Sequence, residues 1–146
     1  MGWTNSHLHQ FTIDGDDYSM PSHEDYLEYI DYRKIKLNQV VNRENQKFLY
    51  EYDFGDGWEH SLVLEKIGRD PNLFPQIPIC LKGKRSRPPE NCGGPFGYEE
   101  LLEIVADPEH EEYHGMIEWL GDYFAPEEFD IDFINQQLKE KDFGCF

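Results

Sequence analysis

Residues 50–60 read YEYDFGDGWEH, and they are the most informative part of the chain. The aromatic residues at positions 48, 50, 52 and 54 alternate with smaller or charged ones, which is the period of a β-strand with two different faces. Gly55-Asp56-Gly57 then supplies positions at which φ can be positive, as a tight turn requires. The sequence therefore predicts a β-hairpin whose return strand begins near Trp58 and runs to about Ile67.

Several side chains able to bind or react gather at the end of this hairpin. They are Asp53, Asp56, Glu59 and His60, and the end of the hairpin is where a site would lie. Asp56 and Trp58 also have structural interpretations, in which the aspartate forms the turn and the tryptophan packs in the core. For Trp58 we favour the structural interpretation.

Composition sets the general class of the protein. The chain has 146 residues, of which 38% are hydrophobic and 15% aromatic, so we expect a single domain over residues 1–146 with a ring-rich core. It contains no apolar run of the ~18–20 residues that a membrane span needs. Its three cysteines are too few for a secreted disulfide scaffold. We expect a cytoplasmic protein without membrane contact.

The net charge of −17 restricts the partners. It repels phosphates, so direct nucleic-acid binding is disfavoured. The charge is uneven, because acidic residues dominate the region from Tyr98 to Phe146, whereas Lys82, Lys84, Arg85 and Arg87 lie close together. This basic loop predicts either a local anion contact or internal ion pairs, and we favour its packing against the acidic half.

The remaining pattern predicts strands first and helices last. We expect a strand over residues 6–13, a turn over 14–17, a short helix over 22–30 and a strand or helix over 35–40. A long irregular connection over 68–97 precedes helices over 98–105, from Pro108 and from Pro126. The predicted fold class is α+β: an antiparallel sheet with the hairpin at its centre and the helices of the C-terminal half packed on one face.

Two histidine patterns suggest metal chemistry. His7 and His9 share one strand face, and with His60 or Asp56 they could hold a divalent transition metal such as zinc, copper, iron or nickel. The alternative is a hydrogen-bonded pair that borders the sheet. Residues 110–114 read HEEYH and match the zinc pattern H-E-x-x-H. Here we favour an ordinary acidic helix start. No cofactor is certain from the sequence.

Three motifs in this order resemble one family. Residues 6–11 (SHLHQF), residues 52–60 and the segment from Gly83-Lys84-Arg85 to Gly97-Tyr98 are similar to the plasmid pRiA4b ORF-3-like family. Further matches are Asp107-Pro108, Trp119 and Phe129. The resemblance covers essentially the whole chain and implies an α+β domain of uncharacterised function. Some family members are labelled as resolvases of transposable elements, so the resemblance also implies a link to plasmids or mobile elements.

The chain departs from the family pattern in two ways. Arg87 and Asn91 stand where the family usually has a cysteine and an aspartate. Family members also have a strand and a helix before the tryptophan that matches Trp3, and this chain begins at that tryptophan. We therefore expect an uncovered sheet edge, which favours self-association.

The leading functional hypothesis is an interaction module rather than an enzyme, accessory to a mobile element, that binds a protein partner or a second copy. Its expected contact surface consists of the hairpin tip and the basic loop: Asp53, Asp56, Trp58, His60, Lys84, Arg85 and Glu90. One alternative is a metal-dependent hydrolase that uses His7, His9 and His60. The other is an accessory nucleic-acid-binding protein that uses the basic loop.

Overall fold

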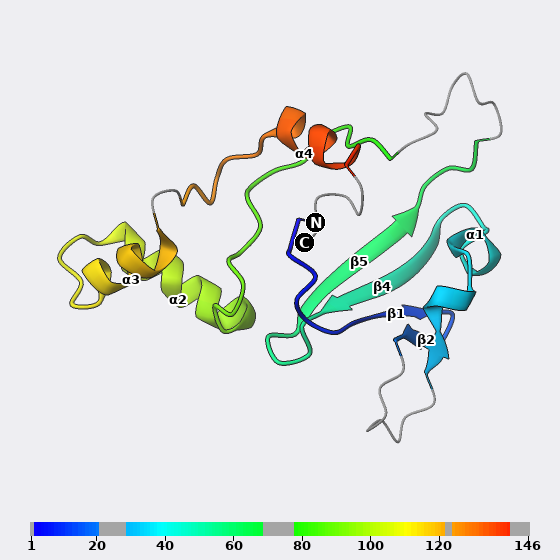
Figure 1. Cartoon of the computed structure of the whole chain (residues 1–146), viewed down its shortest axis with the longest axis horizontal. Helices are drawn as coiled ribbons and strands as arrows, with labels where there is room; N and C mark the ends of the chain where they lie inside the picture. Colours follow the sequence, from blue (N-terminus) through cyan, green and yellow to red (C-terminus); the bar gives the residue numbers. More distant parts are fainter. Residues whose placement is uncertain (1, 21–28, 69–77, 122–123, 141–146) are drawn as a thin grey trace. The chain divides into compact units, whose positions relative to one another are not determined.

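The computed structural model of the chain describes residues 2–20, 29–68, 78–121 and 124–140 (Figure 1). The chain divides into two compact units. The sheet unit is His7–Phe74, and the helical unit combines Met1–Ser6 with Pro75–Phe146. The described residues form a five-stranded sheet and four α-helices, mostly in the C-terminal half, which confirms the α+β class. A single domain and the packing of the C-terminal helices on one face stay predictions.

The sheet is mixed rather than antiparallel throughout. Its strand order is β3-β2-β1-β4-β5, with bounds β1 (His9–Ile13), β2 (Asp16–Ser19), β3 (Ile30–Asp31), β4 (Gln46–Tyr52) and β5 (Trp58–Leu64). β2 pairs with β3 in parallel, whereas the other three pairs are antiparallel. The sequence prediction is wrong at β3 because the connection between Ser19 and Ile30 is longer than a hairpin turn. The helix expected over 22–30 lies mostly outside the described residues.

β4 and β5 form the predicted hairpin. Tyr52 lies opposite Trp58 and Gln46 opposite Leu64, so the return strand does begin at Trp58. It ends at Leu64, earlier than the expected Ile67. Because β5 is the outermost strand in the order, the hairpin forms one side of the sheet and not its centre.

Asp53 organises the turn between these strands. Its φ of 56° is left-handed, as is the φ of 67° at Gly57. One carboxylate oxygen of Asp53 accepts hydrogen bonds from the amides of Gly55 (3.1 Å) and Asp56 (3.4 Å). Its carbonyl oxygen accepts from the amide of Gly57 at 2.6 Å. Aspartate tolerates this conformation because its short side chain bonds the local backbone, so the turn begins at Asp53 rather than at the glycines.

One face of the sheet carries the core of the sheet unit. Ile13, Tyr18 and Val41 form its buried cluster, with these partly buried residues around it: Phe11, Tyr32, Ile35, Val40, Phe48 and Leu64. The opposite face carries Thr12, Asp17, Lys47, Glu51 and Glu59, as the two-residue period of the strands requires. The sheet thus has one mainly apolar face and one polar face, which also carries the exposed Leu49 and Val63.

The segment after β3 is helical, which settles an ambiguity of the sequence. A 3₁₀-helix η1 (Tyr32–Lys34) is followed by the single-turn α1 (Leu37–Val40). Asp31 caps η1, because its carboxylate accepts from the amide and side chain of Arg33. The Gln39 side chain accepts from the amide of Lys36 at 2.7 Å. These local hydrogen bonds, with Val41 buried directly after α1, favour a helix over a strand.

The helical unit contains α2 (Gly94–Ala106), α3 (Tyr113–Leu120) and α4 (Ile131–Gln137), and the sequence misplaced all three starts. α2 begins before Tyr98, because Gly93 at φ 87° forms its N-cap and the following glycines form its first turn. Asp107 does not cap α3. Its carboxylate accepts from the amide of Glu109 at 3.0 Å and forms a separate turn, and α3 begins only at Tyr113.

α4 likewise begins later than the start that was predicted from Pro126. Asp130 is its N-cap, with a carboxylate oxygen that accepts from the amide of Phe133 at 2.8 Å. Pro126 instead lies in the preceding segment, where its carbonyl accepts from the amide of Ser86. A capping side chain therefore sets this helix start, because the Asp130 carboxylate satisfies the Phe133 amide, a first-turn donor that has no partner within the helix.

Two glycine-to-alanine substitutions should change stability in opposite directions. A Cβ at Gly97 would overlap the carbonyl oxygen of Cys92, a backbone atom that cannot move freely, so Gly97→Ala should destabilise the protein by about 1–3 kcal/mol. Gly115 lies in α3 with open space around it, so Gly115→Ala should stabilise by about 0.5–1 kcal/mol. Urea denaturation followed by circular dichroism measures both. Equal effects of the two substitutions would contradict the described start of α2.

Candidate functional site

Asp53 is the most buried of the predicted site residues, at 8% exposed. While one carboxylate oxygen holds the turn, the other lies 3.5 Å from Nδ1 of His7. The Asp53 amide donates to the carbonyl of Leu8 at 2.9 Å. Asp53 therefore ties the approach to β1 to the end of β4, and its hydrogen-bonding capacity is used within the sheet unit.

The other tip residues lie along β5 or just before it. Asp56 has a buried carboxylate oxygen, Oδ2, without a hydrogen-bond partner in the described part of the chain. Trp58 is half-buried and lies opposite Tyr52 on the core face. Glu59 and His60 follow on opposite faces because side chains alternate along a strand. The hairpin thus brings Asp53 and Asp56 to its tip and distributes the others over both faces.

Two of the predicted histidines, His9 and His60, have their rings next to the ring of Tyr50. The Tyr50 ring lies 5.8 Å from the ring of His9 and 5.6 Å from that of His60, centre to centre. His60 Nδ1 is 3.2 Å from the carbonyl oxygen of Tyr50. His9 also stacks on Tyr32 at 5.4 Å. Burial lowers the pKa of His9, since a charged imidazole would lose its hydration there.

These contacts do not gather metal ligands. Among the described residues, no group of three His, Cys, Asp or Glu side chains is placed to hold a metal ion. His7 instead approaches Asp53, and its ring lies nearly perpendicular to that of Tyr52, with the ring centres 5.9 Å apart. A divalent metal at His7, His9 and His60 gains no support from this geometry and stays a prediction.

The HEEYH pattern does not form a zinc helix. His110 lies in the turn before α3, and its Nδ1 accepts from the amide of Glu112 at 3.1 Å. His114 lies inside α3. The two imidazoles therefore do not project from adjacent turns of one helix, as that zinc motif requires. Only Tyr113 and His114 of this segment lie in α3, so the expected helix start is found at the end of the segment and not at His110.

The basic loop packs against the acidic half, as expected. Arg85 pairs with Glu127, with Nε 3.1 Å from a carboxylate oxygen. The hydroxyl of Ser86 donates to the carbonyls of Ala125 and Glu128. Lys84 and Arg85 line, with Glu127, a depression of about 460 Å³. One of the two predicted basic site residues thus has an internal acidic partner.

Glu90 holds the first residues of the chain. Its carboxylate accepts from the amide and the hydroxyl of Thr4 at 2.8 and 2.9 Å. Beside this contact, the indole nitrogen of Trp3 donates to the carbonyl of Pro88 at 3.1 Å, and Trp3 is 7% exposed. Glu90 therefore positions the N-terminal segment within the helical unit.

The sequence reasoning missed a pair of like charges on the hairpin. Glu51 and Glu59 lie directly opposite each other on the polar face, and neither forms an ion pair within the described part of the chain. Like charges at this spacing repel. The sequence alone does not predict this pair, because it depends on the strand register. Once Tyr52 lies opposite Trp58, Glu51 must lie opposite Glu59.

Comparison with known proteins places the chain in a family. Residues 1–133 match the family described as Plasmid pRiA4b ORF-3-like protein, so the chain belongs to it and the resemblance is confirmed. The chain is 42% identical over 122 residues to "Uncharacterized protein y4hQ" of Sinorhizobium fredii, a match that covers 83% of this chain and 62% of that protein. The chain thus spans less than two thirds of the length of this relative.

A solved structure has the same fold. The crystal structure of a protein of unknown function, MM3350 from Methanosarcina mazei Go1, superposes with a TM-score of 0.75 at 38% identity, covering 90% of this chain and 74% of that one. Neither relative carries a named activity. In the part of the chain that the structure describes, no helix has the length and apolar character needed to cross a bilayer.

The lowered pKa of His9 predicts acid sensitivity. A depressed folded-state pKa contributes stability above the ordinary value of 6.5 that is lost as pH falls from there through the folded pKa. His9→Phe keeps the ring on Tyr32 and removes the titration, so its stability should fall less over that pH range. The exposed His114 provides a control, and His114→Gln should retain the wild-type slope. Parallel slopes for all three proteins in urea titrations would refute the role of His9.

Reversing one charge of the glutamate pair should stabilise the sheet. Glu59→Lys converts a repulsive cross-strand pair into an attractive one, which should raise the free energy of unfolding by roughly 0.5–1 kcal/mol. Glu65→Lys makes the same change of net charge beyond the end of β5 and serves as the control. Thermal unfolding measures both. A gain equal to that of the control would show only relief of the general negative charge.

Proposed function

We propose that this chain is a protein-interaction module, and that the edge of β5 away from β4 pairs with an extended, basic segment of a partner protein. The observation that carries the proposal is the position of β5, a seven-residue strand at the end of the strand order. β5 includes Trp58 and His60, two of the residues predicted for the contact surface. Addition of a strand to such an edge is a common way to bind a peptide.

The main-chain groups of β5 support this mode of binding. The carbonyl of Leu64 faces β4, because it accepts from the amide of Asn45 at 2.7 Å. Successive residues of a strand direct their main-chain groups to opposite sides. Glu59, Ser61 and Val63 therefore direct theirs away from β4, where β5 has no further strand neighbour among the described residues. Unpaired donors and acceptors of this kind are a template for another strand.

The charges support a basic partner. Glu59 is exposed, so a lysine or arginine on an incoming strand would lie beside its carboxylate, with that of Glu51 one strand further away. Cross-strand pairs of opposite charge are stabilising. The net charge of −17 would also attract a basic segment and repel a second copy of this chain. We therefore propose a basic partner rather than self-association.

The roles of the polar residues favour binding over catalysis. Asp53 bonds to turn amides and His60 contacts the Tyr50 carbonyl, so both serve the hairpin itself. Arg85 pairs with Glu127. A link to plasmids or mobile elements stays a proposal that rests on the name of the family.

The test is a titration of nitrogen-15-labelled protein with a short peptide that alternates lysine with valine. Binding should shift the amide signals of Glu59, Ser61 and Val63 most strongly. Ser61→Pro removes one outward amide and should weaken binding about tenfold while the hairpin remains folded, since proline is tolerated on strand edges. Glu59→Lys should weaken it as well, and Glu65→Lys should not.

A peptide with glutamate in place of lysine is the matched control and should not bind. Equal binding of both peptides would refute the electrostatic part of the proposal. Dimerisation of the free protein through β5, seen by analytical ultracentrifugation and abolished by Ser61→Pro, would replace the partner by a second copy. Absence of any shift at β5 would overturn the proposed function.

A further inference from the structure

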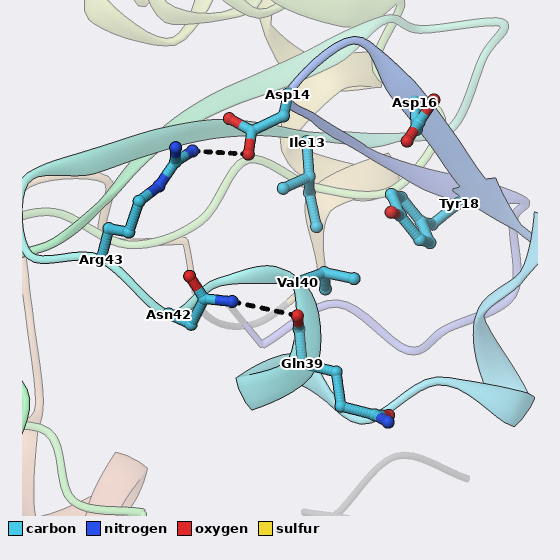
Figure 2. A pocket seen from close by; sticks show the side chains of 8 residues that line it. All are labelled: Ile13, Asp14, Asp16, Tyr18, Gln39, Val40, Asn42 and Arg43. Atoms are coloured by element: carbon cyan, nitrogen blue, oxygen red, sulfur yellow. Dashed lines mark hydrogen bonds and ion pairs between the residues drawn. The ribbon is translucent and has the colours of Figure 1, made fainter.

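A depression of about 310 Å³ lies between the β1–β2 turn and α1 (Figure 2). It lies within the sheet unit and does not include β5. Its lining combines apolar and acidic residues, among them Ile13, Asp14, Asp16, Tyr18, Val40 and Asn42. This volume is at the lower end of the range for small-molecule sites.

Strand register explains why these side chains converge. Ile13 lies opposite Asp16, and Tyr18 follows two residues later on the same face. Asp14 and Gly15 form the tight turn, with φ values of 52° and 94°. Val40 is the last residue of α1 and packs against the core cluster from the other side. The depression is therefore built by the hairpin turn and the helix together.

Tyr18 supplies a hydroxyl group without a hydrogen-bond partner at the end of a buried ring. The residue is 7% exposed, and its hydroxyl makes no hydrogen bond with any described residue. Figure 2 shows the hydroxyl end of the ring turned toward Ile13 and Val40, into the depression. Burial, with the nearby charges of Asp16 and Asp14, raises the pKa of Tyr18, so the hydroxyl stays protonated at neutral pH. In the described part of the chain, the buried side-chain polar atoms without a hydrogen-bond partner belong to His9 and Asp56, so the Tyr18 hydroxyl is accessible to a ligand in the depression.

The surrounding groups are mainly hydrogen-bond acceptors. Asp14 is already paired, because one of its carboxylate oxygens lies 2.6 Å from Arg43 and accepts from Gln46. Asp16 forms no ion pair within the described part of the chain. The Asn42 side-chain amide donates to the carbonyl of Gln39 at 3.1 Å, as the dashed line in Figure 2 marks, so its oxygen is left as an acceptor. A positively charged donor fits this set.

We propose that this depression binds a small primary aliphatic amine, with the ammonium group between Asp16 and the Tyr18 hydroxyl and the alkyl chain on Ile13 and Val40. Two of the ammonium hydrogens match acceptors on the carboxylate and the hydroxyl, and the third is left to water. The apolar side chains exclude water from one side, which strengthens the contact with the carboxylate. Arg43 is held on Asp14 and leaves the second carboxylate available.

The probe is butylammonium, added to nitrogen-15-labelled protein in roughly 0.15 M salt, which screens long-range attraction to the net negative charge. Amide shifts should saturate and centre on Asp16, Tyr18 and Val40. 1-Butanol has the same alkyl chain without the charge and should bind at least about tenfold more weakly. Equal binding of the alcohol would overturn the ammonium assignment.

Three variants test the assignment. Asp16→Asn should weaken butylammonium binding about tenfold, and Tyr18→Phe, which keeps the ring in the core, should weaken it severalfold. Asp17→Asn is the matched control, because Asp17 lies on the opposite face and accepts from the hydroxyl of Thr12. It should leave binding unchanged. An equal loss in Asp16→Asn and Asp17→Asn, or shifts spread over all acidic residues, would mean general charge attraction and refute the site.

Discussion

The turn at Asp53 fixes how β4 lies on β5, and most of the sheet unit depends on that register. Its left-handed backbone and carboxylate hydrogen bonds leave Tyr52 facing Trp58. From that single pairing follow the contact of Tyr50 with His60 and the opposition of the two glutamates. A slip of one residue would exchange the core and solvent faces of one strand. The position of one aspartate therefore determines which side chains form the core and which form the charged surface.

The sequence predicted the hairpin because its signal is local and strong. Alternating aromatic residues followed by a glycine-rich turn fit few local structures other than a β-hairpin. The helix starts were predicted less well, since Pro108 and Pro126 both fit an N-terminal position but neither begins a helix. Asp107 forms a turn and Asp130 caps a helix, and the hydrogen bonds that distinguish these two roles depend on the fold. The parallel pairing of β3 depends on a non-local contact that no local pattern encodes.

The candidate sites could be predicted only in part from the sequence. Choosing polar residues at the hairpin tip found Asp53 and His60, but did not reveal that both bond to the backbone around them. The depression beside α1 was missed because residues 14–17 were assigned to a turn, whereas β2 already begins at Asp16. That shift places Asp16 and Tyr18 on the face of Ile13. The same residue type has different surroundings in a turn and on the core-facing side of a strand, and the sequence alone does not distinguish the two.

The bond from Trp3 to Pro88 has a consequence for the order in which the protein can form during synthesis. The sheet unit is one continuous segment, so all of its strands have been made once Phe74 has been added. The helical unit joins the first residues to the second half of the chain, and this contact spans 85 positions. Trp3 and Thr4 are therefore made long before Pro88 and Glu90, the residues that they contact. These residues leave the ribosome well before the segments that complete their native contacts.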